Sequence, residues 1–204
     1  MKSSWSESRA AFEAAAEWFV STASYVGDRW EQPGLGEWDV RALVGHASRS
    51  FITVETYLAQ TPDTIEVESA PLYYRAILPM LVGPAVAERG RAAGEALGDD
   101  PVQSVREVAD RVTALVRRST GDELLTSIAG GMRLRDYLPT RTFELVIHTC
   151  DLAVALGRPV TPPALAARDT MQLCIEVAID DGRAGDVLLA LTGRRPLPPG
   201  FSVV

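Results

Sequence analysis

The sequence predicts an all-α protein, built as a bundle of helices in a single domain. Three observations predict it. Apolar residues recur at the three- and four-residue spacing of amphipathic helices, proline and glycine residues separate these segments, and no linker is long enough to divide the chain. A length of 204 residues with 47% hydrophobic and 23% charged residues also suits one compact globular domain.

The N-terminal part of the chain contains two predicted helices. The first is expected over residues 3–28, where one side of the helix is apolar at Phe12, Ala16, Phe19 and Ala23. A loop with Pro33 and two glycines follows it. The second helix is expected over residues 38–58, because Asp39 can cap the backbone at its start.

The middle of the chain is expected to add further helices. Pro62 and Asp63 mark the turn after the second helix. Residues 71–97 have a helical pattern that is interrupted at Pro79 and at the Gly83-Pro84 pair. Residues 101–119 have a continuous apolar stripe, formed by Val102, Val105, Ala109, Val112 and Val116.

The C-terminal part begins at the Gly130-Gly131 pair, which breaks the chain before the next helix. That helix is expected over residues 139–157, since helices often end at a glycine. Two prolines at 162 and 163 then open a helix to about residue 181, with Thr161 as its expected cap. A short final helix over residues 184–192 is expected to pack on the bundle.

The predicted helix over residues 139–157 has a polar stripe on an otherwise apolar surface. Arg141, Glu144, His148 and Asp151 are spaced three, four and three residues apart, so they lie on one helix face within roughly 80° of one another. A helix that is apolar nearly all round is buried, and buried charges need partners. The stripe therefore faces the protein interior or a cleft, where a metal ion or a salt bridge would compensate its charges.

The chain has only two histidines, and the other one, His46, lies in the predicted helix over residues 38–58. Taken singly, either histidine could be a core residue hydrogen-bonded to protein oxygens. Together with Glu144, His46 and His148 supply two nitrogens and one oxygen, the donor set of catalytic zinc sites that keep a fourth position open. The same set could hold ferrous iron or another divalent metal.

Three runs of sequence resemble a known family. They are W-D-V-R-A-L-V-G-H at 38–46, R-T-F-E-L-V-I-H-T-C-D-L-A-V-A-L-G at 141–157, and L-L-A-L-T-G-R-R-P-L-P-P-G-F at 188–201. In this order they resemble the mycothiol-dependent maleylpyruvate isomerase family, a branch of the DinB-like metalloproteins. The likeness extends from about residue 10 to the C-terminus.

The resemblance implies a DinB-like four-helix bundle with additional C-terminal helices. It also implies a divalent metal, usually zinc, held by His46, Glu144 and His148. We expect one domain over 1–204, with the metal-binding bundle at 10–157 and a helical extension at 158–204 packed on it. The isomerase itself carries a further C-terminal domain, so the resemblance implies that this chain is more similar to the shorter relatives.

The resemblance further implies mycothiol, the sugar-linked thiol that replaces glutathione in actinobacteria, as cosubstrate. The leading hypothesis is a metal-dependent transferase or isomerase, in which a thiolate attacks a small electrophilic substrate. A second hypothesis is a metal hydrolase or hydratase that needs no thiol. A third is a helical domain that binds a metal or a small ligand without catalysis.

Other side chains near the expected site have two interpretations each. Trp30, in the loop that leads to His46, is the candidate aromatic wall of a cofactor pocket, whereas Trp38 has the position of a helix-start staple. Asp151 could fix the tautomer of a histidine ligand, and Arg141 could bind an anionic group of the substrate. As purely structural residues, both would form salt bridges that tether the helix.

Composition limits the partners. A net charge of −7 and the lack of a dense basic run exclude nucleic acid, and the longest nearly apolar stretch, residues 76–87, is too short for a membrane span. The N-terminus lacks the apolar core of a secretory signal, so we expect a cytoplasmic protein. Cys150 and Cys174 are expected to be small core residues, since Cys150 lies about 200° around the helix from His148. A homodimer is one candidate for the oligomeric state.

Overall fold

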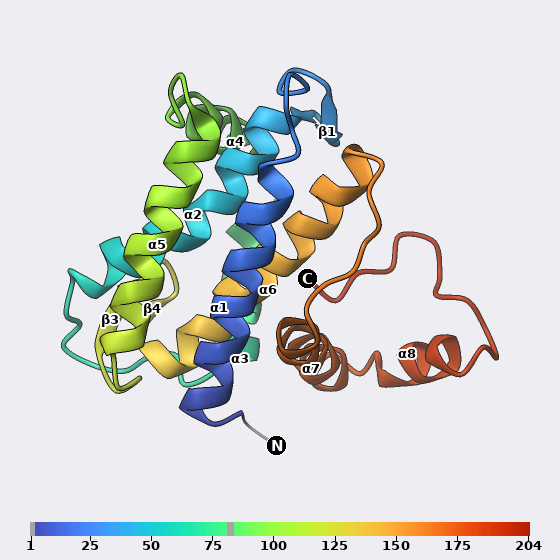
Figure 1. Ribbon diagram of the computed structural model, residues 1–204. Helices are drawn as coiled ribbons and strands as arrows, with labels where there is room; N and C mark the ends of the chain where they lie inside the picture. The colour runs from blue at the N-terminus through green and yellow to red at the C-terminus, as the bar shows by residue number, and fades with distance from the viewer. Residues whose placement is uncertain (1–2, 81–83) are drawn as a thin grey trace.

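The all-α prediction is confirmed by the structure, a computed structural model that describes residues 3–80 and 84–204 (Figure 1). Helices dominate the described residues and are accompanied by two small sheets. The helices are α1 (Trp5–Ala23), α2 (Val40–Leu58), α3 (Ala70–Ile77), α4 (Pro84–Glu95), α5 (Pro101–Arg118), α6 (Leu134–Ala155), α7 (Ala164–Asp180) and α8 (Ala184–Leu191), with a 3₁₀ helix at Leu78–Met80.

Four helices, α1, α2, α5 and α6, form the bundle (Figure 1). Each of α1 and α2 packs against both α5 and α6, α4 lies on α2, and α3 lies on α6. Helix α7 packs against α1 and α6, and α8 packs on α7. None of the described helices is both long and apolar enough to cross a bilayer.

The bundle core consists of the apolar stripes that the sequence pattern indicates. Phe12, Phe19 and Phe51 have no exposed surface, and the rings of Phe12 and Phe19 on α1 each contact the ring of Phe51 on α2. Burial of each such side chain stabilises the fold by about 1.5–3 kcal/mol. The expected apolar stripe of α5 also faces this core, except at Val102, which is only partly buried. The hydrophobic effect therefore fixes which faces of the four helices meet.

The starts of α1 and α2 are fixed by capping. Ser4 accepts a hydrogen bond from the backbone N–H of Glu7, and the Glu7 carboxylate accepts one from the N–H of Ser4. Asp39 accepts a hydrogen bond of 2.7 Å from the N–H of Ala42, which confirms it as the cap of α2. The first helix is shorter than the predicted 3–28, because the chain leaves it before Gly27, which has a φ of 63°.

Two antiparallel hairpins were not predicted from the sequence. One pairs β1 (Pro33–Leu35) with β2 (Trp38–Asp39), and the other pairs β3 (Leu124–Ser127) with β4 (Gly130–Arg133). The pair Gly130 and Gly131 therefore belongs to a hairpin. A Cβ on Gly131 would lie 2.0 Å from the carbonyl oxygen of Thr64, so only glycine allows the segment before α3 to pack against β4.

The helix that carries Glu144 and His148 begins at Leu134, not at Pro139 as predicted. Strand β4 leads directly into it, and Pro139 lies inside the helix, where it removes one backbone hydrogen bond near the start. The predicted helix over residues 71–97 is divided into α3 and α4, as the proline at 79 indicates. Gly83 lies outside the described residues.

The start of α7 corrects one further prediction. The expected cap, Thr161, lies before the helix, and the residue at the cap position is Pro163, which makes no side-chain hydrogen bond there. The reason is that α7 begins two residues later than the double proline indicates, at Ala164. It ends at Asp180, close to the predicted end.

Candidate metal centre

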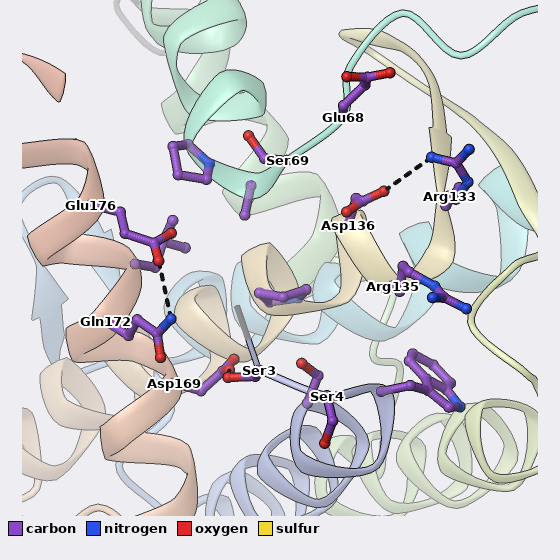
Figure 2. Close-up of a pocket in the computed structure, with 16 residues that line it drawn as sticks. Ser3, Ser4, Glu68, Ser69, Arg133, Arg135, Asp136, Asp169, Gln172 and Glu176 are labelled. Carbon is purple, nitrogen blue, oxygen red and sulfur yellow. Dashed lines mark hydrogen bonds and ion pairs between the residues drawn. The ribbon is translucent and has the colours of Figure 1, made fainter. Parts of the chain in front are cut away.

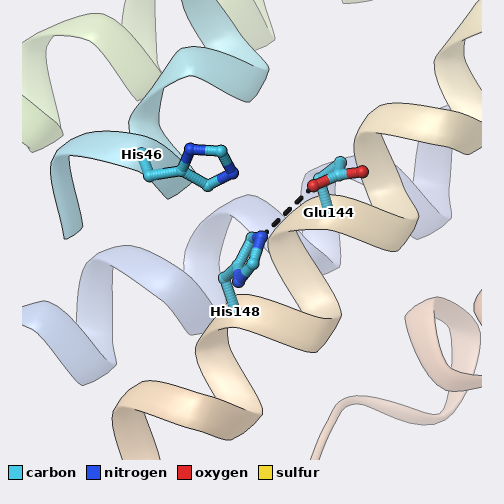
Figure 3. A group of neighbouring side chains, drawn as sticks. All are labelled: His46, Glu144 and His148. Atoms are coloured by element: carbon cyan, nitrogen blue, oxygen red, sulfur yellow. Dashed lines mark ion pairs between the residues drawn. The ribbon is translucent and has the colours of Figure 1, made fainter. Parts of the chain in front are cut away.

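The packing of α2 on α6 brings the two histidines and Glu144 together (Figure 3). Glu144 and His148 lie one turn apart on the same face of α6, and His46 faces them from α2. One ligand atom from each residue lies within 4.8 Å of the other two. The three predicted ligands therefore form a compact cluster across a helix-helix interface.

Glu144 has a hydrogen-bond partner on each carboxylate oxygen. Its Oε2 lies 3.3 Å from Nε2 of His148, and its Oε1 accepts a hydrogen bond of 2.8 Å from the phenol of Tyr74. Burial alone would raise the pKa of Glu144, but the bond to His148, the charge of Arg141 and the Tyr74 phenol lower it to about 2. Glu144 is therefore anionic throughout the neutral range.

His148 has both ring nitrogens engaged by carboxylates. Its Nδ1 lies 3.2 Å from Oδ2 of Asp151, and its Nε2 faces Glu144. Burial lowers the pKa of His148, but the hydrogen bonds to Asp151 and Glu144 outweigh burial and raise it to about 9. Asp151 thus occupies the place expected of a residue that orients a histidine ligand.

His46 differs from His148 in having an unpaired ring nitrogen. Its Nδ1 is buried and lacks a hydrogen-bond partner among the described residues, and its other nitrogen faces the Glu144–His148 pair (Figure 3). Burial and the nearby His148 lower the pKa of His46 to about 4, although Glu144 acts in the opposite direction. His46 is therefore neutral near pH 7, which is the form of imidazole that binds metals.

The donor set and its surroundings fit a divalent metal. A core histidine normally has both nitrogens satisfied by protein oxygens, whereas Nδ1 of His46 has no hydrogen-bond partner among the described residues. The side chains of His148 and Glu144 are 14% and 21% exposed, so an ion and a further ligand can reach them from solvent. His46, Glu144 and His148 together would supply two imidazole nitrogens and one carboxylate oxygen, which leaves room for a fourth ligand.

Arg141 is buried, with 7% of its surface exposed, and it forms no ion pair in the described part of the chain. Its guanidinium lies 4.9 Å from the ring centre of Tyr137 and 5.6 Å from that of Tyr73, while its Nε donates to Oγ1 of Thr140. The structural alternative of a salt bridge is not found for Arg141 among the described residues, where two aromatic rings lie beside the cation. Its charge acts on Glu144, whose pKa it lowers.

The aromatic residue beside the candidate ligands is Trp38. Its ring centre lies 4.5 Å from that of His46, and its Nε1 donates a hydrogen bond to the carbonyl oxygen of Ala87. Trp30 instead has the guanidinium of Arg41 5.9 Å from its ring centre. Sequence reasoning placed Trp38 at a helix start but gave no signal that this position adjoins the bundle interior.

Tyr74 was also missed by sequence reasoning, because no local pattern links α3 to the face of α6 that carries Glu144. Cys150 and Cys174 are half-buried free cysteines that pack against the core, and burial raises the pKa of both thiols. Cys150 does not belong to the cluster of possible ligands in the described residues. Both cysteines therefore pack against the core but are only partly buried, rather than being core residues as the sequence predicts.

Comparison with known families gives one match. Residues 12–153 match the family model of the mycothiol maleylpyruvate isomerase N-terminal domain. The matched segment covers more than half of the chain and includes all three candidate ligands. No curated protein and no solved structure matches the chain.

Proposed function

Because this chain belongs to the family of the mycothiol maleylpyruvate isomerase N-terminal domain, we propose that it is a metal-dependent enzyme with a thiol cosubstrate. His46, Glu144 and His148 hold the metal, with zinc as the first candidate. Mycothiol is the proposed thiol, and a small electrophile is the proposed second substrate. The reaction is S-transfer to that electrophile or its isomerisation.

The proximity of three ligand atoms of the right chemistry carries this proposal. They lie within 4.8 Å of one another on two different helices, at a place that solvent reaches. Packing alone does not require two imidazoles and a carboxylate to converge in this way, since burial of such groups is costly unless they are compensated. A divalent cation would replace the proton shared by His148 and Glu144 as the positive charge between them.

The bound cation would supply positive charge that lowers the pKa of a thiol and makes it nucleophilic near neutral pH. The residues around it have distinct tasks. Asp151 accepts the Nδ1 proton of His148 and so leaves Nε2 as the donor atom, while Tyr74 holds Oε1 of Glu144. Trp38 covers His46 on one side.

The cluster of possible ligands in the described residues includes no cysteine that could serve as the nucleophile, which favours a thiol that arrives as cosubstrate. The thiolate sulfur forms a bond to an electrophilic carbon of the substrate. If that bond breaks again after rearrangement, the product is an isomer and the thiol is regenerated. If it persists while a leaving group departs with its electron pair, the product is an S-conjugate.

Elemental analysis of the purified protein, prepared without chelator or added metal, tests the site. We expect about one equivalent of zinc or another divalent metal, and almost none in the His148→Ala variant. Glu88→Gln, at an exposed position on α4, is the matched control and should retain the metal. A metal-free protein that also fails to bind zinc, nickel or iron on reconstitution would contradict the proposed site.

The thiol requirement is tested with maleylpyruvate and 1-chloro-2,4-dinitrobenzene as electrophiles. Turnover of either should require both metal and mycothiol, and should be lost in His148→Ala. Turnover with metal but without thiol would replace the proposal with a hydrolase or hydratase. A bound metal that raises the melting temperature without any turnover would indicate a noncatalytic binding domain.

A further inference from the structure

A second cavity lies away from the candidate metal ligands, at the end of the bundle where α1 begins (Figure 2). Its volume is about 500 Å³, and its walls come from the starts of α1, α3 and α6 and from one side of α7. This volume is in the range of sites for small organic molecules. The polar groups that matter most here are Ser3, Arg133, Arg135, Asp169 and Glu176.

Asp169, on α7, is the most unusual residue of this cavity. Only 8% of its surface is exposed, and its Oδ2 has no hydrogen-bond partner among the described residues. Its Oδ1 has a single long contact of 3.4 Å from the hydroxyl of Ser3. The carboxylate points toward the other residues that line the cavity (Figure 2), and rotation about the soft Cβ–Cγ bond brings either oxygen to face the space.

No cation of the described residues compensates Asp169. Arg133 is paired with Asp136 at 3.9 Å, and Arg135 is paired with Asp122, outside the cavity lining. The charged groups with the strongest electrostatic effect on Asp169 are the carboxylates of Glu176 and Glu7, and both repel it. A buried carboxylate in a negative environment is costly unless a positive partner is supplied.

We propose that this cavity binds a small organic molecule through an ammonium group that pairs with Asp169. The cavity is far larger than a single metal ion, and the described residues around it form no cluster of metal ligands comparable to His46, Glu144 and His148. The apolar walls, which include Trp5, Pro71 and Leu173, suit the hydrocarbon part of such a molecule. An ammonium donates hydrogen bonds and supplies the missing positive charge.

The energetics of Asp169 agree with this assignment. Burial raises the pKa of Asp169 to about 6, and repulsion by Glu176 and Glu7 adds to it, while Ser3 opposes it. Among the described residues, the ionised carboxylate of Asp169 therefore has no compensating charge at neutral pH. A bound ammonium would remove this cost, which makes the amine a better ligand than a neutral molecule of the same shape.

Titration followed by NMR tests the proposal, with the indole N–H of Trp5 as the reporter in the cavity wall. The probes are 2-phenylethylamine, cyclohexylamine and 1,4-diaminobutane, and 2-phenylethanol is the neutral counterpart of the first. At least one amine should shift the Trp5 signal saturably, and 2-phenylethanol should bind about tenfold or more weakly. If no amine gives a saturable shift, or the alcohol binds equally well, the proposal is wrong.

The variant Asp169→Asn keeps the shape of the side chain and removes its charge. It should weaken amine binding about tenfold or more, and Asp110→Asn, on the exposed side of α5, should leave it unchanged. Equal binding by Asp169→Asn and the natural chain would overturn the assignment. Because the amine–alcohol comparison uses the natural chain, the test remains decisive even if Asp169→Asn does not fold.

This site is independent of the proposed metal function. The His148→Ala variant, which should lose the metal, should bind the amine as the natural chain does. If the natural chain binds the amine but no metal, only the cavity proposal is supported. If the natural chain binds the metal but no amine, only the cavity proposal is overturned.

Discussion

The phenol of Tyr74 donates a hydrogen bond of 2.8 Å to Oε1 of Glu144, and so connects α3 to the candidate metal ligand on α6. Tyr74 is completely buried, and burial together with the nearby Glu144 raises its pKa well above the usual value. The phenol therefore keeps its proton and remains a donor. With Oε1 held in this way, Oε2 of Glu144 faces His148.

The first prediction concerns this bond. Tyr74→Phe removes the hydroxyl and keeps the ring, so zinc affinity should fall about 10- to 100-fold, the usual effect of losing a residue that orients a metal ligand. Chelator competition on the purified variant measures it. Tyr73→Phe is the control, because the Tyr73 hydroxyl contacts Arg141 and not Glu144. Equal zinc affinity in the two variants would show that Tyr74 does not position the carboxylate.

The second prediction concerns Asp151, whose Oδ2 lies 3.2 Å from Nδ1 of His148. Asp151→Asn should weaken zinc binding about tenfold or more, because the histidine loses the negative partner that favours Nε2 as the donor. Isothermal titration with zinc measures the change. The same substitution at Asp180, an exposed residue of α7, should have no effect. Unchanged affinity in Asp151→Asn would assign this carboxylate to helix stability alone.

The third prediction concerns the contact between α2 and α4 beside His46. A Cβ on Gly45 would lie 2.2 Å from the backbone nitrogen of Gly94, so Gly45→Ala must push α4 away from α2. The free energy of unfolding should fall by about 1–3 kcal/mol, as for other overpacked positions. Gly185, in α8, has nothing within 4 Å of its Cβ position. Gly185→Ala should be neutral or slightly stabilising in the same urea denaturation experiment, because alanine favours the helix.

The fourth prediction is a pH dependence of stability that Asp169 causes. Its pKa of about 6 in the folded protein is higher than the value of an unfolded chain, about 3.9, so the folded state binds the proton more tightly. The free energy of unfolding should therefore fall by about 1–3 kcal/mol as pH rises from about 4 to about 6.

Asp169→Asn should abolish this part of the pH dependence, since asparagine stays neutral. The variant should be more stable than the natural chain at about pH 7.5 and similar to it at about pH 4. Urea denaturation with a chelator present measures both and keeps any metal contribution constant. The other carboxylates that line the cavity, Glu68, Asp136 and Glu176, are unchanged in this comparison. If the natural chain is less stable relative to Asp169→Asn at about pH 4 than at about pH 7.5, the predicted sign of the pH dependence is contradicted.

Much of the fold follows from local patterns in the sequence. The cap at Asp39 and the valine stripe of α5 are local features, and the structure has them where the sequence predicts. The start of α6 is different. A proline is common in the first turn of a helix, which favours a start at Pro139. Here β4 ends at Arg133 and α6 begins at the next residue, so Pro139 lies inside the helix, where tertiary packing compensates its cost.

The candidate site divides in the same way. The spacing of Glu144, His148 and Asp151 fixes their common face, because the helix repeat alone determines it. That Tyr74 reaches Glu144, and that Trp38 rather than Trp30 lies on His46, could not be predicted, since these contacts join elements that are distant in the sequence.

The sequence by itself determined the helical class, the polar stripe on α6 and the chemical types of the three candidate ligands. Only the tertiary structure decided that His46 meets the stripe and which neighbours contact the candidate ligands. It also decided that Asp169 is buried beside a cavity in which no cation of the described residues compensates it. The physical reason is the separation along the sequence of the residues that make each contact. Helix periodicity is a property of a few consecutive residues, whereas these contacts depend on which apolar faces pack together, and that packing is settled by the whole core.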